Sequence, residues 1–229
     1  MTTRKQTLLF LLLGSARFIL TVAVFYLLIA ASARLVMTPL FLQLEYGRPG
    51  FPEDPYGLSV EDRLHYAPPV LDYLIYNQTI DSLASLFFPD GLPLFNSREL
   101  DHMMDVQRLT AVVFSTAVVI AFVVAVTSLA LRQTGHSDVI RCAFRDAGLL
   151  TLGLIGLIVV FAVSSWNAFF TGFHTAFFAD GTWYFAYSDT LIRLFPEQFW
   201  FDAALAVGLL AALGALCLIF VTWRMGRSA

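Results

Sequence analysis

Charged residues and cysteines are scarce in this sequence. Only 14% of its 229 residues are charged, whereas soluble globular chains are about a quarter charged. The two cysteines, Cys142 in a polar connection and Cys217 in an apolar run, are poorly placed to form a disulfide. The net charge of −3 argues against a nucleic-acid partner. HExxH, CxxC and Gly-rich phosphate-loop motifs are absent, so we expect neither a metal site nor a cofactor.

Long apolar runs are present instead. Hydrophobic residues make up 58% of the chain, and its mean hydropathy is +0.73. A helix needs ~20 apolar residues to cross the bilayer. Four stretches meet this length, which predicts a single all-α integral membrane domain, residues 1–229, with transmembrane helices at 17–36, 106–131, 148–165 and 199–223.

The N-terminus resembles a signal peptide. Arg4 and Lys5 precede an apolar stretch and the small residues 14–16. Arg17 follows at once and a second apolar run begins, so we interpret the segment as an uncleaved signal anchor.

Basic residues gather on one side of the predicted membrane. The ends of the chain and the connection 132–146 are rich in them, and the loops 37–105 and 167–198 carry more carboxylates than arginines. Because cytoplasmic flanks favour Lys and Arg, the connection 132–146 and both termini are expected inside the cell.

The first outer loop, residues 37–105, is too long for a simple connection. Ser59 and Asp62 have the spacing of a helix start, and Pro68-Pro69 predicts the start of another short helix. The two outer loops are therefore expected to form a small extracytoplasmic cap of short helices and turns.

Two histidines lie near the predicted outer interface. Asn96 and Glu99 have the spacing of a capping box, and a helix of ~35 residues starting there would hold His102 above the membrane. His174 continues a polar stripe, Ser164, Asn167, Thr171 and His174, on an extension of the third helix.

Two imidazoles are able to act as base and acid near neutral pH. The candidate catalytic residues are therefore His102 and His174, with supporting or substrate-binding roles expected for Asp101, Asp105, Asn167, Trp183, Asp189 and Arg193. The alternative is structural: His102 as a solvated residue on a capped helix start, and His174 as an interfacial anchor.

The segment Leu94 to Val106, with Asn96, Arg98, Glu99, His102 and Asp105 in the pattern FNxRELxHMxDV, resembles the signature of a bacterial family of four-helix membrane proteins. The run Phe173 to Phe178, followed by Trp183 and by residues 189–192 and 195–196, resembles its second motif. The family's characterised members are lipoprotein intramolecular transacylases.

The resemblance implies an enzyme of the bacterial cytoplasmic membrane with its active site at the outer face. Its partners would be membrane lipid and the N-terminal cysteine of a diacylated lipoprotein. The enzyme would move the sn-2 acyl chain of the diacylglyceryl group onto the cysteine α-amine, giving a lyso-form lipoprotein. The family's two functional histidines correspond to His102 and His174, and we expect His102 to be the base and His174 the electrophilic or acid partner, or the reverse.

Other functions remain open at this point. His102 and His174 could be axial ligands of a haem, although the resemblance argues against it. A transporter is disfavoured because the apolar runs show no internal repeat. A non-catalytic scaffold that binds lipoproteins or lipid is the other alternative.

Overall fold

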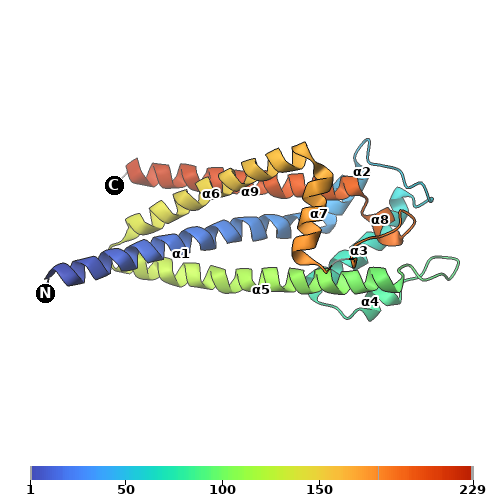
Figure 1. Cartoon of the computed structure of the whole chain (residues 1–229), viewed down its shortest axis with the longest axis horizontal. Coiled ribbons are helices and arrows are strands. Elements are labelled where there is room, and N and C mark those ends of the chain that lie inside the picture. Colours follow the sequence, from blue (N-terminus) through green and yellow to red (C-terminus); the bar gives the residue numbers. More distant parts are fainter. Residues whose placement is uncertain (1, 180, 228–229) are drawn as a thin grey trace. The chain divides into compact units, whose positions relative to one another are not determined.

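The computed structural model describes residues 2–179 and 181–227, and within them the regular structure is helical apart from one isolated bridge between Phe87 and Pro93. The helices are α1 (Thr2–Val36), α2 (Pro39–Gly47), α3 (Val60–Tyr76), α4 (Asp81–Ala84), α5 (Ser97–Gln133), α6 (Ser137–Ser164), α7 (Trp166–Phe177), α8 (Thr190–Leu194) and α9 (Glu197–Arg227) (Figure 1).

Four of these helices are long and apolar enough to cross a membrane: Arg4–Val36, Ser97–Gln133, Ser137–Ser164 and Glu197–Arg227. These helices carry many exposed Leu, Val and Phe side chains, as expected of helices solvated by lipid. The predicted all-α membrane fold with four transmembrane helices is thus confirmed.

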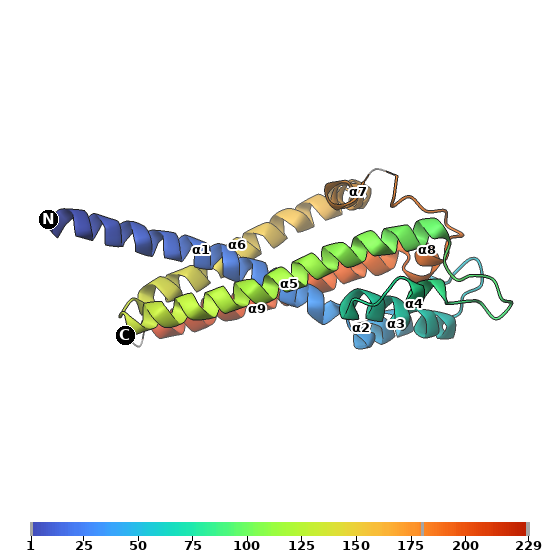
Figure 2. The same cartoon turned by 90° about the horizontal axis from the view of Figure 1, so that it is seen from below.

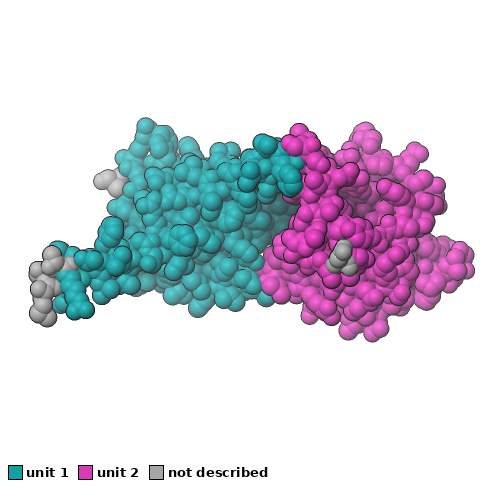
Figure 3. Space-filling model, in the orientation of Figure 1, with its two compact units in different colours: residues 1–33, 115–161, 207–229 teal, residues 34–114, 162–206 magenta. Residues whose placement is uncertain are grey.

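The chain divides into two compact units (Figure 3). Unit 1 comprises residues 1–33, 115–161 and 207–229, and unit 2 comprises residues 34–114 and 162–206. In unit 1 the Arg17 side chain pairs with Asp146 of α6, with 2.8 Å between Nε and Oδ2. A charge at this place in an apolar helix is thereby neutralised by a partner on a neighbouring helix.

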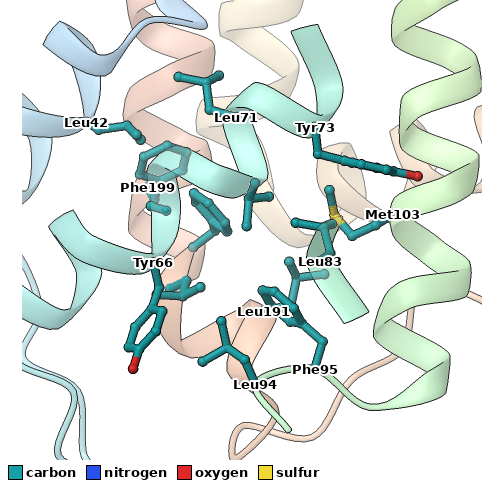
Figure 4. Close-up of a cluster of buried hydrophobic side chains, with 14 of the residues drawn as sticks. Leu42, Tyr66, Leu71, Tyr73, Leu83, Leu94, Phe95, Met103, Leu191 and Phe199 are labelled. Carbon is teal, nitrogen blue, oxygen red and sulfur yellow. The ribbon is translucent and has the colours of Figure 1, made fainter. Parts of the chain in front are cut away.

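Unit 2 contains the short helices and has its own hydrophobic core. α3 packs against α2, α4 and α8 (Figure 2). Their apolar faces meet in a buried cluster to which α5 and α9 also contribute, drawn in Figure 4 and including Leu42, Tyr66, Leu71, Tyr73, Leu83, Leu94, Phe95, Met103, Leu191 and Phe199. The long first outer loop is therefore a folded cap.

The start of α3 follows the prediction, but its middle does not. Ser59 and Asp62 form a capping box, with the Asp62 backbone N–H donating to Ser59 Oγ over 3.0 Å. Pro68 and Pro69 lie inside α3, so the second short helix expected there is wrong. A proline normally breaks a helix because it lacks an N–H donor. Here the buried residues on both sides of the prolines pack into the core, and this packing holds the helix together.

The third membrane helix also differs from its prediction. α6 ends at Ser164, and Ser165 has extended backbone angles (φ −162°, ψ 97°) and caps a separate helix, α7. The Ser165 hydroxyl accepts a hydrogen bond from the Ala168 backbone N–H over 3.3 Å. Ser164 is therefore not on the helix that carries His174. The connection before α6 is also shorter than expected, because α5 continues to Gln133 and α6 begins at Ser137.

Candidate functional site

The two candidate histidines come together in unit 2. His102 lies on α5 and His174 on α7, and their ring centroids are 6.3 Å apart with an interplanar angle of 23°. This distance is too long for a hydrogen bond between the rings. Both rings are therefore able to act on a third group.

The capping box that precedes His102 forms as predicted. The Glu99 backbone N–H donates to Asn96 Oδ1 over 3.1 Å, and the Asn96 backbone N–H donates to Glu99 Oε2 over 2.7 Å. This reciprocal cap fixes the first turn of α5. His102 follows Glu99 by three residues and so lies on the same face of the helix.

His102 is a buried side chain, 6% exposed, between aromatic rings. Phe178 and Phe185 approach it edge-on, with centroid distances of 5.0 Å and 5.3 Å. Its Nδ1 atom is buried and has no hydrogen-bond partner among the described residues. A buried polar atom without a partner is uncommon in native proteins and is a frequent mark of a functional site.

His174 is half-buried and held by one hydrogen bond. Its Nδ1 lies 2.8 Å from the carbonyl oxygen of Phe170, one turn earlier in α7. The ring also packs on Trp183, with a centroid distance of 4.9 Å. Burial lowers the pKa of His174, and the bond to the Phe170 carbonyl opposes this shift. The site therefore favours the neutral imidazole.

Two of the predicted supporting residues lie around the histidines, and a third, Asp105, has an ion-pair partner on its own helix. Trp183 and Asp189 belong to the surroundings of the histidines, since Trp183 contacts His174 and Asp189 binds the start of α5. Asp105, one turn after His102, forms an ion pair with Arg108 over 3.1 Å.

The remaining predicted residues do not join the site. Asp101 and Asn167 are exposed, and no described contact links either to His102 or His174. Arg193 pairs with Asp54 over 3.0 Å in the cap and does not contact the histidines in the described part of the chain. Within residues 2–179 and 181–227, no three His, Cys, Asp or Glu side chains group as ligands for a metal ion.

Glu99 has a second role that the sequence did not predict. Its side chain is 1% exposed, and Oε1 accepts a hydrogen bond from the backbone N–H of Leu191 in α8 over 2.6 Å. The capping-box pattern indicates only the local bond to Asn96. The partner in α8 is 92 residues further along the chain, and no local sequence pattern points to it.

The fold and the site define a multi-pass membrane protein with an aromatic-walled pair of histidines, of which His102 is buried and His174 half-buried. The sequence model of the family described as lipoprotein intramolecular transacylase Lit matches residues 18–200, and the chain belongs to this family. At the level of the family, the protein is a membrane acyltransferase that acts on lipoproteins.

The chain is also similar to individual proteins, in sequence or in fold. A protein of Aquifex aeolicus (strain VF5), described as uncharacterized, is 31% identical over 195 residues, which cover 85% of this chain and 87% of the relative. The solved structure of the membrane integral lipoprotein intramolecular transacylase Lit from Bacillus cereus has a TM-score of 0.76 at 14% identity, covering 95% of this chain and 99% of that one. A variant of that protein with one histidine replaced by arginine has a TM-score of 0.70 at 12% identity, covering 100% and 98%. At 14% and 12% identity, the likeness to the two solved structures is one of fold.

Proposed function

We propose that this protein moves the sn-2 acyl chain of a lipoprotein's diacylglyceryl-cysteine onto the α-amine of that cysteine. The observation that carries the proposal is the pairing of buried His102 with half-buried His174, whose ring centroids are 6.3 Å apart and which come from two helices. The substrate supplies both the nucleophile and the ester. The protein therefore needs to hold them together and to move protons, and it needs no nucleophile of its own.

His174 suits the role of general base. A carbonyl oxygen only accepts hydrogen bonds, so the bond to Phe170 places the hydrogen on Nδ1. In the neutral ring this leaves the lone pair on Nε2. The Nε2 atom is then the one that removes a proton from the attacking amine.

His102 suits the role of oxyanion stabiliser. Attack of the amine nitrogen on the ester carbon forms a C–N bond and a tetrahedral oxyanion. A neutral imidazole N–H from His102, in its water-poor aromatic surroundings, donates a hydrogen bond to this oxygen. The ester C–O bond then breaks, and His174 returns its proton to the glycerol oxygen. Atoms and charges balance, because one proton passes from nitrogen to oxygen as the acyl group passes from oxygen to nitrogen.

We also propose that the site lies at the outer face of the cytoplasmic membrane, with both termini in the cytoplasm. Lys and Arg near the membrane are concentrated at the termini and around the α5–α6 connection, which supports this orientation. The diacylated cysteine would then meet the histidines at the membrane surface. Reporter fusions at each terminus and in the cap give opposite signals if the orientation is right.

Tandem mass spectrometry of a lipoprotein N-terminus tests the reaction. The transfer is intramolecular and leaves the intact mass unchanged, so the acyl position must be read from fragments. In cells that lack other N-acylating enzymes, we expect wild-type protein to give an N-acyl, S-monoacylglyceryl cysteine. His102→Ala and His174→Ala remove this product.

The two remaining histidines provide matched controls. His65 is exposed and His136 is half-buried, and no described contact links either to His102 or His174, so His65→Ala and His136→Ala keep full activity. A diacylglyceryl cysteine that stays unchanged with well-expressed wild-type protein contradicts the reaction. That result favours a scaffold that binds lipoproteins without acting on them.

A further inference from the structure

The first turn of α5 holds the segment that follows α7. Asn96 Nδ2 donates to Asp189 Oδ1 over 3.2 Å, and Arg98 Nη2 donates to Asp189 Oδ2 over 2.9 Å. Glu99 Oε1 accepts from the Leu191 N–H over 2.6 Å. Three residues of one helical turn thus bind one short stretch of chain, and Glu99 is the buried member of the set.

The chain directly before Asp189 carries the aromatic rings that cover the histidines. Asp189 closes a turn with Ala186, whose N–H donates to Asp189 Oδ2 over 2.8 Å, directly after Phe185. The rings of Phe178, Trp183 and Phe185, here called the aromatic cover, contact His102, His174 or both. Arg98 also lies over the Phe185 ring, with 5.8 Å from Cζ to the centroid. The position of the cover is therefore tied to the start of α5.

An acyl ester between these histidines faces two competing nucleophiles. The substrate amine gives the N-acylated product, and water gives a free fatty acid. In the second case the acyl carbon gains the hydroxyl of water, the bond between the acyl carbon and the glycerol oxygen breaks, and the glycerol oxygen takes the remaining proton. A base that activates an amine also activates water. Exclusion of water must then decide which product forms.

Resting on the proposed function, we infer that Glu99 is a positioning residue that holds the aromatic cover over His102 and His174, and so directs the acyl group to the amine instead of water. Glu99 does not touch the reacting atoms. It acts through Leu191 and the turn at Asp189, which set the position of Phe185. A carboxylate suits this task because its two oxygens accept from both Asn96 and Leu191.

The test measures the partition between the two products. Purified Glu99→Gln protein is incubated with a diacylated lipopeptide in heavy-oxygen water. A glutamine side chain has a single acceptor oxygen, so one of the two backbone N–H groups loses its partner. The expected result is a rise of roughly tenfold in labelled fatty acid relative to N-acylated lipopeptide, the population change that follows the loss of one buried hydrogen bond.

A matched acid controls for helix capping. Asp62 is the corresponding carboxylate in the capping box of α3, and it accepts from the Ser59 backbone N–H over 2.8 Å. Asp62→Asn removes a capping charge without touching the aromatic cover. It releases no labelled fatty acid. If Glu99 served only as a helix cap, both variants would lower the yield of folded protein and leave the product ratio unchanged.

A second pair of variants keeps the inference testable if Glu99→Gln does not fold. Phe185→Ala removes a ring from His102 and is expected to release labelled fatty acid. Tyr187→Ala truncates an aromatic side chain of the same loop that is 81% exposed, and it is expected to release none. Folded Glu99→Gln or Phe185→Ala protein that transfers the acyl chain without labelled fatty acid overturns the inference. Wild-type protein that forms no N-acylated product contradicts the proposed function itself.

Discussion

The Nδ1 atom of His174 lies 2.8 Å from the carbonyl oxygen of Phe170, and this bond fixes which ring nitrogen is available for chemistry. With the hydrogen on Nδ1, the neutral ring presents the Nε2 lone pair. The carbonyl belongs to the same helix, one turn earlier, so the orientation of the ring follows from α7 itself. The assignment of His174 as the base rests on this bond.

The first prediction concerns the pH dependence of acyl transfer. Burial lowers the pKa of His174 from its ordinary value of about 6.5, so the ring stays neutral to lower pH than a solvated histidine. Activity that requires the neutral base is then present above pH 6.5 and is lost only as the pH falls through the lowered pKa. The kcat profile, measured with a lipopeptide, should therefore contain an acid limb with its midpoint below pH 6.5, separate from the titration of the substrate amine near pH 7.7 to 8.0.

The second prediction identifies that limb. Trp183 packs on His174 with a centroid distance of 4.9 Å, and Trp183→Leu replaces this ring with a smaller side chain. With less burial, the pKa of His174 rises towards its ordinary value, so the acid limb moves to higher pH. The substrate amine titrates near pH 7.7 to 8.0 in every variant and serves as an internal reference. A limb that does not move in Trp183→Leu would show that another group titrates there.

The sequence predicted the histidines because they lie in motifs whose neighbours have local roles. Asn96 and Glu99 indicate where α5 begins, and the helical repeat then sets the height of His102. The polar stripe on the predicted third helix indicated His174, and the resemblance to the family then supported both histidines. No local rule predicted that the two rings would lie 6.3 Å apart, because that distance depends on how two separate helices pack.

The errors arose where tertiary packing overrides local preference. Pro68 and Pro69 normally break a helix, but the core of the cap holds α3 together around them. A serine is compatible with a helix interior, yet Ser165 caps α7 and ends the predicted continuous helix. Arg193 was expected near the histidines as a supporting residue, and that role stays a prediction. Arg193 lies against Asp54, which is distant in the sequence.

The third prediction concerns the stability of the cap. Arg193 and Asp54 form an ion pair with side chains only 13% and 1% exposed, respectively. Arg193→Ala leaves the Asp54 carboxylate buried without this partner, which destabilises a folded protein by about 3–5 kcal/mol. A clear fall in the thermal unfolding midpoint in detergent, with faster proteolysis of the cap, is expected.

Asp138→Ala is the control. The Asp138 carboxylate is 82% exposed and pairs with Arg141, and exposed pairs of this kind contribute about 1 kcal/mol or less. Equal midpoints for the two variants would contradict the assigned role of the buried pair.

The last prediction uses two glycines of α6 that differ in their surroundings. A Cβ atom added at Gly148 would lie 2.8 Å from the carbonyl oxygen of Ala215 and 2.9 Å from Cγ1 of Ile219, both on α9. Small residues allow membrane helices to approach this closely. Gly148→Ala should force the helices apart and destabilise the protein by about 1–3 kcal/mol.

At Gly153 nothing lies within 4 Å of the added atom, so Gly153→Ala has no clash and gains the higher helix propensity of alanine. Unfolding midpoints in detergent should therefore fall for Gly148→Ala and hold or rise for Gly153→Ala. The opposite order would mean that α6 and α9 do not pack through Gly148.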